Sequence, residues 1–122
     1  MKTQERLENK FKDFINEDSL PYYFYSHDKE GVFTYISPQM TDLLGFSIED
    51  FKSFYLSHAT ANPLNKEMIR YTRQCLKGIV QDPYLVEVYD KDYKVHLLRV
   101  FEMPVYEEEE IVGLEGVAKL LS

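Results

Sequence analysis

The segment of residues 28–51 constrains the fold most, because turn, strand and helix signals follow one another closely in it. It opens with Asp28-Lys29-Glu30-Gly31, whose glycine can take the positive φ that a hairpin loop requires. Residues 32–36 are almost all β-branched or aromatic, which favours a strand. The sequence therefore predicts a hairpin that ends in this strand.

Signals for two short helices come directly after the strand. Ser37-Pro38 supplies an N-cap residue and a proline suited to the first helical position, and Gly45 fits the position after a helix end. Ser47 is followed three residues later by Asp50, as in a capping box. One strand followed by two short helices is an uncommon local order.

The remaining elements follow from periodicity and turn residues. Residues 22–27 predict the first strand of the hairpin, and Asn62-Pro63 opens a helix that Lys77-Gly78 ends. Three further strands are predicted over residues 84–89, 94–105 and 111–121. Between the last two lies an acidic run, Glu107 to Glu110, which we interpret as a solvated hairpin tip.

The N-terminal residues 3–17 predict one amphipathic helix. Its apolar side chains fall on one stripe, formed by Leu7, Phe11, Phe14 and Ile15. A helix of this length is marginal in water by itself, so the stripe must be covered. The cover is either the chain's own sheet or a second copy, and we expect a homodimer with these four residues at its interface.

Composition excludes several classes of function. The net charge of −7 over 122 residues argues against nucleic-acid binding, which needs clustered lysine and arginine. A single cysteine rules out an internal disulfide and fits a reducing, cytoplasmic location. No apolar run approaches the ~20 residues of a membrane span, so we expect no direct membrane insertion.

The ordered signals resemble a PAS domain. The family's motif has Asp-x-x-Gly, an aliphatic and aromatic strand, Ser-Pro, and then Leu-Leu-Gly-Phe-Ser-x-Glu-Asp, which residues 43–50 reproduce. The resemblance implies an α+β PAS fold, a five-stranded antiparallel sheet with helices between strands two and three. It divides the chain into an N-terminal amphipathic helix at residues 1–20 and a PAS domain at 21–122.

Two positions depart from the family pattern. Tyr93 stands where these domains usually have a glycine, so the hairpin must take another turn or place a non-glycine residue in a strained conformation. Leu120, Leu121 and Ser122 occupy the positions of the Asp-Ile-Thr signature that couples the family's domains to their effectors.

No catalytic or cofactor motif stands out. His27, His58 and His96 form no triad or metal spacing, and the five glycines make no phosphate loop. The haem-binding members of the family carry a histidine on the long helix, which is absent here at residues 64–77. The flavin-binding members need a cysteine elsewhere than Cys75. We therefore predict a non-catalytic domain with no cofactor, metal or covalent chromophore.

A pocket between the sheet and the helices is the remaining candidate site, open to an unknown small-molecule ligand. Its predicted lining is Tyr35, Met40, Leu44, Phe54, Leu64, Met68, Tyr71 and Cys75. The alternative is that these residues simply fill the core.

The resemblance implies a bacterial sensory module in signal transduction. It would bind a small molecule or a partner and relay to an effector domain of histidine kinase, diguanylate cyclase or chemoreceptor type. The alternative is a ligand-free module that only dimerises its host protein.

Overall fold

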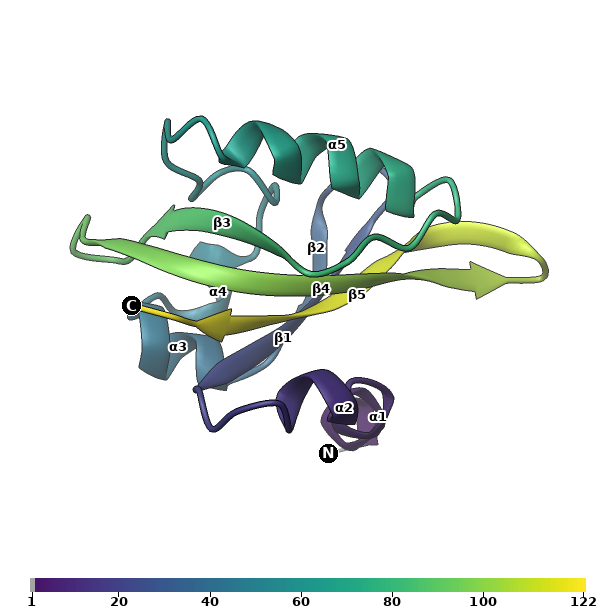
Figure 1. Ribbon diagram of the computed structural model, residues 1–122, viewed down its shortest axis with the longest axis horizontal. Helices are drawn as coiled ribbons and strands as arrows, with labels where there is room; N and C mark the ends of the chain where they lie inside the picture. Colours follow the sequence, from purple (N-terminus) through teal and green to yellow (C-terminus); the bar gives the residue numbers. More distant parts are fainter. Residues whose placement is uncertain (1) are drawn as a thin grey trace.

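A computed structural model describes residues 2–122 as one antiparallel sheet with helices on both faces (Figure 1). The helices are α1 (Lys2–Lys10), α2 (Lys12–Ile15), α3 (Gln39–Leu44), α4 (Ile48–Phe51) and α5 (Asn65–Cys75). The strands are β1 (Tyr22–Asp28), β2 (Phe33–Ile36), β3 (Tyr84–Tyr89), β4 (Val95–Glu107) and β5 (Glu110–Leu120). Their spatial order is β2-β1-β5-β4-β3, and every neighbouring pair is antiparallel. The predicted five strands, with helices between the second and third, are confirmed.

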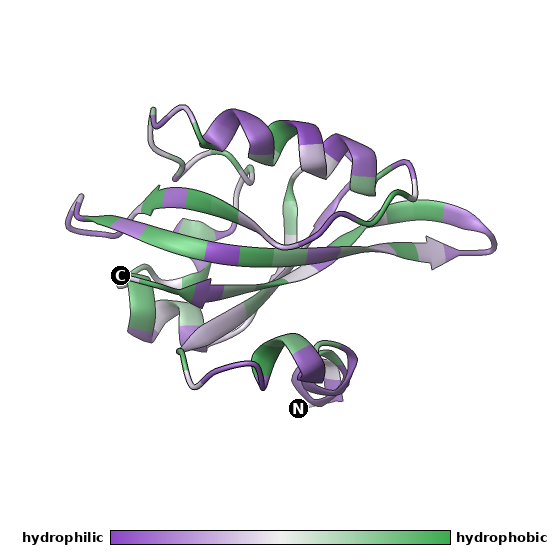
Figure 2. Cartoon of the chain, viewed as in Figure 1, coloured by the Kyte–Doolittle hydropathy of each residue, from purple (hydrophilic) through white to green (hydrophobic). Residues whose placement is uncertain are grey.

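The two faces of the sheet have separate cores. Side chains alternate between the two faces along each strand, and β4 in Figure 2 is mostly hydrophobic with hydrophilic residues interspersed. The inner face packs against α3, α4 and α5, with Met40 and Leu44 of α3 and Met68 of α5 in its core. The outer face packs against α1 and α2, with Phe24 of β1 and Val117 of β5 in its core. In Figure 1, α5 and the α1–α2 pair accordingly lie on opposite sides of the sheet.

The first hairpin forms as its turn residues predict. The Asp28 carboxylate accepts hydrogen bonds from the backbone N–H groups of Glu30 and Val32, both at 3.0 Å. Gly31 has φ +86°, in the region that favours glycine. A Cβ atom at Gly31 would lie 2.6 Å from the ring of Tyr55, so the bare backbone also lets that ring approach.

The helix signals after β2 are confirmed except at Ser37 and Pro38, because Pro38 is the N-cap of α3 and not its first helical residue. Gly45 ends α3 with φ +85°, and the Ser47 hydroxyl accepts from the backbone N–H of Asp50 at 3.1 Å. Ser37 is not the N-cap of α3. Its hydroxyl instead accepts from the backbone N–H of Phe24 at 2.8 Å, and α3 begins after Pro38. The serine extends the β1–β2 pairing where β2 ends, so its hydroxyl is occupied by the sheet.

The predicted single N-terminal helix is two helices in the structure. α1 ends at Lys10 and α2 begins at Lys12, with Phe11 at φ −106° and ψ 17° between them. The sheet surface is twisted, and the break lets the apolar stripe follow it. Leu7 and Phe14, on either side of the break, both stay buried against the same sheet.

The long helix starts two residues later than its sequence signal. The Asn62 side-chain oxygen accepts from the backbone N–H of Leu64 at 3.0 Å, which caps a turn before α5 begins at Asn65. Gly78 follows the helix with φ +91°. At the β3–β4 turn Tyr93 has φ +63°, so this hairpin keeps a non-glycine residue in the left-handed region.

None of the helices within residues 2–122 is long and apolar enough to cross a membrane.

Candidate functional site

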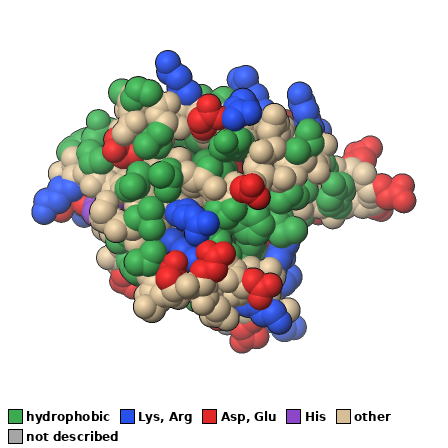
Figure 3. Space-filling view, in the orientation of Figure 1, with side chains coloured by type: hydrophobic (Ala, Val, Ile, Leu, Met, Phe, Trp, Pro, Cys, Tyr) green, Lys and Arg blue, Asp and Glu red, His purple; other side chains and the backbone are tan. Residues whose placement is uncertain are grey.

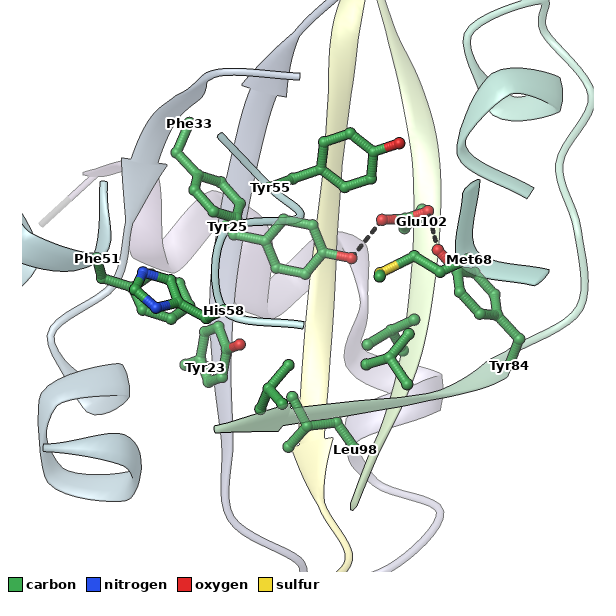
Figure 4. Close-up of a pocket in the computed structure, with 13 residues that line it drawn as sticks. Tyr23, Tyr25, Phe33, Phe51, Tyr55, His58, Met68, Tyr84, Leu98 and Glu102 are labelled. Atoms are coloured by element: carbon green, nitrogen blue, oxygen red, sulfur yellow. Dashed lines mark hydrogen bonds between the residues drawn. The ribbon is translucent and has the colours of Figure 1, made fainter. Parts of the chain in front are cut away.

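The inner face of the sheet contains a cavity of about 40 Å³ between the strands and the helical side of the domain (Figure 4). Most of its wall comes from the strands and from the segment between α4 and α5, with one residue from α5. The lining residues are Tyr23, Tyr25, Phe33, Phe51, Tyr55, His58, Met68, Tyr84, Val86, Val88, Leu98, Val100 and Glu102.

A buried carboxyl group lies at one end of this cavity. Glu102 of β4 is 7% exposed, and each of its two carboxyl oxygens accepts a hydrogen bond from a tyrosine hydroxyl. Tyr25 of β1 donates to one oxygen and Tyr84 of β3 to the other, both at 2.5 Å. Figure 4 shows the two phenols reaching the carboxyl group from opposite sides. Side chains from three strands, β1, β3 and β4, therefore meet at one carboxyl group.

Gly116 leaves room for the Tyr25 side chain, which passes over β5 to contact Glu102 on β4. Tyr25 and Glu102 lie on β1 and β4, and both are paired with Gly116 on the intervening β5. A Cβ atom at Gly116 would lie 2.7 Å from the Tyr25 hydroxyl and 3.0 Å from the Phe101 carbonyl oxygen. The tyrosine ring thus crosses β5 over a glycine, where no side chain blocks it.

Burial raises the pKa of Glu102, because water no longer solvates the charged form. The hydrogen bonds from Tyr25 and Tyr84 act in the opposite direction but do not outweigh the burial. Within the described part of the chain, no lysine or arginine forms an ion pair with Glu102. The carboxyl group therefore has hydroxyl partners and no lysine or arginine paired with it, and His27 is the basic side chain close enough to act on its pKa.

Two histidines border the cavity region. His58 stacks on Phe51 with ring centroids 4.7 Å apart, and burial lowers its pKa, so its ring is neutral at pH 7. His27 stacks on Tyr55 at 5.0 Å, and its Nδ1 pairs with the Asp28 carbonyl oxygen at 2.7 Å. The Nε2 atoms of both rings are buried and have no hydrogen-bond partner.

The outer face of the same strands holds a second buried carboxyl group. Glu115 of β5 is 4% exposed and forms ion pairs with two cations of α1. Arg6 donates two hydrogen bonds to it, at 2.8 and 2.9 Å, and Lys10 donates one at 2.6 Å. These contacts outweigh the effect of burial and lower the pKa of Glu115. They attach α1 to the middle of the sheet.

A second group of ion pairs attaches the segment after α2. Lys119 of β5 is fully buried, with its Nζ 3.2 Å from Asp18 and 3.9 Å from the centroid of the Phe14 ring. Arg99 of β4 donates to Glu17 at 2.9 Å. Figure 3 shows basic and acidic side chains next to each other where α2 meets the sheet. We call the contacts of Glu115 and Lys119 with the N-terminal segment the outer ion pairs.

Of the eight residues predicted to line the pocket, Met68 is the one that lines this cavity. Met40, Leu44 and Cys75 lie in the same inner core but behind the cavity wall. Tyr71 packs on Tyr84 of the wall, with ring centroids 4.7 Å apart.

The other three lie elsewhere. Tyr35 packs with the outer core, because it points to the opposite face of β2 from the cavity. Phe54 is 42% exposed, and Leu64 is half-buried in the turn before α5. Contact between a ligand and any of the eight stays a prediction.

The four residues predicted at a dimer interface contact the chain's own sheet. Leu7, Phe11 and Phe14 are buried in the outer core, and the half-buried Ile15 packs against it. Of the two covers considered for this stripe, the structure shows the chain's own sheet. Dimerisation itself stays a prediction.

The sequence interpretation missed Glu102, although it carries a readable signal. Leu98, Val100 and Glu102 follow one another at the period of two that places side chains on one face of a strand. An acidic residue in that inward series marks a buried carboxyl group. The tyrosines that reach it belong to strands distant in sequence, so nothing local identifies them.

Neither a protein-family model nor a curated protein sequence matches this chain. Solved structures do. The PAS domain of a protein from Colwellia psychrerythraea has a TM-score of 0.70 and 16% identity, covering 94% of this chain and 96% of that one. The LOV domain of a blue-light activated histidine kinase from Erythrobacter litoralis has a TM-score of 0.70 and 13% identity, covering 84% of this chain and 98% of that domain.

The match to that kinase also holds for a longer chain of it. There the TM-score is 0.69 at 12% identity, over 84% of this chain and 34% of the kinase chain. At these low identities the similarity shows the fold, which is that of a PAS domain.

Proposed function

We propose that this domain is a non-catalytic sensory module of a signalling protein. A small molecule in the inner cavity would change how β5 holds α1 and α2, and those helices would pass the change to an effector domain. One observation carries the proposal: successive residues of β5 contact the cavity wall on one face of the sheet and the N-terminal segment on the other. Gly116 lies under the Tyr25 ring on the inner face, while Glu115 and Val117 contact α1 and the outer core.

The first step of the proposed relay is at Tyr25. Its ring fills the space over Gly116, so a ligand that displaces the ring also changes what β5 packs against. Buried cores are close-packed and respond to small changes in volume, which makes a sub-ångström shift of β5 sufficient.

The second step is on the other face of the same strand. Glu115 holds Arg6 and Lys10, and the neighbouring Val117 packs with Phe11 and Phe14. A shift of β5 alters both contacts together and so weakens the attachment of α1 and α2. Release would expose the stripe of Leu7, Phe11 and Phe14 to a second copy of the chain, which is how we reconcile the expected homodimer with the buried stripe.

The Erythrobacter kinase supports the choice of effector by analogy, because the matching domain there is one part of a longer chain with a kinase name. We propose a cytoplasmic parent protein whose effector is of histidine kinase, diguanylate cyclase or chemoreceptor type. The rival function is a ligand-free dimerisation module, and the small cavity of about 40 Å³ favours it.

Tyr25→Phe tests the relay, and Tyr84→Phe is its matched control. Each variant removes one hydroxyl from Glu102, but only Tyr25 crosses β5. With 13C-labelled methionine methyl groups, Met68 reports on the cavity wall and Met103 on the outer core. We expect both variants to shift Met68 in NMR spectra and Tyr25→Phe to shift Met103 several times more.

Limited proteolysis between α2 and β1 gives a second readout, and we expect faster cleavage there in Tyr25→Phe than in Tyr84→Phe. Equal Met103 shifts and equal cleavage rates in the two variants would contradict the proposed relay through β5.

A further inference from the structure

We propose that the ligand class of the inner cavity is a small ammonium ion, from methylammonium to trimethylammonium, bound between the Glu102 carboxylate and the aromatic wall. The inference rests on the proposed function, since it names the molecule whose binding that function requires. The observations that carry it are an acidic group without a cationic partner, a ring-lined wall and a small volume.

The carboxyl group is the first observation. Buried charges in proteins are paired with opposite charges, and the contrast with Glu115, which has Arg6 and Lys10, shows that this chain can supply such partners. Among the described residues Glu102 pairs with no lysine or arginine, and its polar neighbours are the hydroxyls of Tyr25, Tyr84 and Thr72 and the ring of His27. An ionised carboxylate offers about four lone-pair sites, so about two stay open for further donors.

The two tyrosine hydroxyls hold both oxygens of the carboxyl group. Tyr25 donates to one oxygen and Tyr84 to the other, each at 2.5 Å. The two donors also orient the carboxyl group at the end of the cavity, as Figure 4 shows. A cation that enters would meet an acceptor already fixed in place.

The wall is the second observation. Six tyrosine and phenylalanine rings line a cavity of this small size together with the ring of His58, and they come from Tyr23, Tyr25, Phe33, Phe51, Tyr55 and Tyr84. The faces of aromatic rings attract cations, and rings grouped around a carboxylate are the environment in which alkylammonium ions bind. The aliphatic part of the wall, such as Val86 and Leu98, would contact the methyl groups.

The volume limits the size of the ion. By this measure a water molecule needs roughly 10–15 Å³, so about 40 Å³ holds about three waters. That space suits an ion of roughly two to four heavy atoms, and the largest of the proposed ions would displace all the water from the cavity.

Protons compete with the ammonium ion for the same carboxylate. The polar and titratable groups around Glu102 come from β1, β3, α5 and the segment after α4, and are Tyr25, His27, Tyr55, Thr72, Cys75 and Tyr84. His27 is the basic side chain among them, and His58 lines the same cavity. Since burial raises the pKa of Glu102, protons compete for its carboxylate over a wider pH range than at an exposed glutamate, and below that pKa the affinity for a cation must increase with pH.

The test is an NMR titration of the full chain with trimethylammonium chloride, followed at the Met68 methyl group in the cavity wall. 2-Propanol, which has four heavy atoms like trimethylammonium, is the neutral probe, and sodium chloride controls for ionic strength. We expect saturable binding of trimethylammonium, with affinity that increases up to tenfold per pH unit below the pKa of Glu102 and no such change for 2-propanol.

Glu102→Gln removes the charge and keeps the shape of the side chain. We expect at least tenfold weaker trimethylammonium binding in this variant and unchanged 2-propanol binding. Glu110→Gln, which makes the same charge change at the exposed hairpin tip, should leave both affinities as in the wild type. If Glu102→Gln does not fold, Tyr55→Leu tests the wall instead, with several-fold weaker binding of the ammonium ion alone.

Two results would overturn the ligand class. One is a Met68 signal that trimethylammonium and methylammonium leave in place up to about 100 mM, far above a millimolar dissociation constant. The other is 2-propanol binding as tightly as the ions. The Met103 signal distinguishes a wrong ligand class from a failure of the relay. If the ammonium ion shifts the Met68 signal and not the Met103 signal, the ligand class stands and the sensory relay is wrong.

Discussion

Glu102 and Glu115 are the same residue type on neighbouring strands, yet their surroundings differ in kind. Glu115, on the outer face, has two cations within 2.8 Å and a lowered pKa. Glu102, on the inner face, has two hydroxyls and a raised pKa. Both are buried, at 4% and 7% exposure, so burial alone does not explain the difference.

A sheet can surround a buried charge in two ways. On the outer face the chain supplies the opposite charge itself, and the ion pairs attach α1 to β5. On the inner face no lysine or arginine of the described residues pairs with Glu102, and we propose that its ionisation depends on what occupies the cavity.

The largest expected effect comes from Phe11→Glu, which places a carboxylate among the apolar side chains of the outer core. Phe11 is 1% exposed in the outer core, and Phe11→Glu should cost about 4 kcal/mol or more, since truncating a buried phenylalanine alone costs about 3–5. We expect α1 and α2 to separate from the sheet, seen as rapid proteolysis of residues 2–20. Phe54→Glu, at 42% exposure, is the matched control and should change the unfolding free energy little.

Sedimentation of the Phe11→Glu variant also tests the expected dimer. A wild-type dimer that the variant converts to a monomer would show that the stripe serves a second copy as well as its own sheet. A wild type that is monomeric throughout would leave the stripe with the intramolecular role alone.

A smaller effect is expected when a side chain on β5 blocks the hydrogen bond between Tyr25 and Glu102. Gly116→Ala places a methyl group 2.7 Å from the Tyr25 hydroxyl, so the ring must move away from Glu102. Overpacking of this kind costs about 1–3 kcal/mol. Chemical denaturation measures the loss, and the Met68 signal should move more than the Met103 signal. Wild-type stability in Gly116→Ala would show that Tyr25 adapts freely and that the crossing carries no strain.

The pH dependence of stability should separate the two glutamates by sign. The folded pKa of Glu115 lies below its usual value of 4.5, so its contribution is present above that pH and is lost as pH falls through the folded pKa. The folded pKa of Glu102 lies above 4.5, so its contribution is present at acid pH and is lost as pH rises through the folded value.

Single glutamine variants test these signs by urea unfolding between about pH 3 and pH 8. At neutral pH, Glu115→Gln should cost about 2 kcal/mol, as expected for hydrogen bonds to a charged group, and the cost should fall toward acid pH. Glu102→Gln should cost most at acid pH and least at neutral pH. Parallel profiles for the two variants would contradict the proposed difference in charge compensation.

The smallest effect concerns Cys75, a neutral neighbour of the inner carboxyl group. Burial, followed by the charge of Glu102, raises the pKa of this thiol to about 12, so it should not react with alkylating reagents in the folded chain. Cys75→Ala should cost about 1–2 kcal/mol through a small cavity. Rapid alkylation of the wild type at pH 7 would show that the inner core opens more readily than its burial indicates.

The sequence predicted elements wherever one residue type is tied to one backbone geometry. Gly31 and Gly45 take the positive φ values expected of them, and Ser47 caps the helix it precedes. Prediction failed where a residue had two possible partners. Ser37 can cap a helix or pair with a strand, and the sheet decided between them. The break at Phe11 likewise depends on the shape of the sheet below it.

The cavity was harder to predict for a related reason. Its position on the inner face was expected, but most of the predicted lining was taken from the helices, whereas most of the wall comes from strands. The contact of Tyr25 with Glu102 depends on register across three strands, and the two residues are 77 positions apart. Such a contact follows from pairing geometry and not from local pattern.

The strand order has a consequence for how the chain folds. β5 is the last strand in sequence and the middle strand of the sheet, between β1 and β4. During synthesis the β1–β2 hairpin and the β3–β4 hairpin can form early as local units, but they have no partner until the final strand leaves the ribosome. Assembly must then wait for non-local pairing, which is slow and leaves strand edges open to other chains. A nascent chain that stalls before β5 would present two unpaired hairpins and so be a target for chaperones or aggregation.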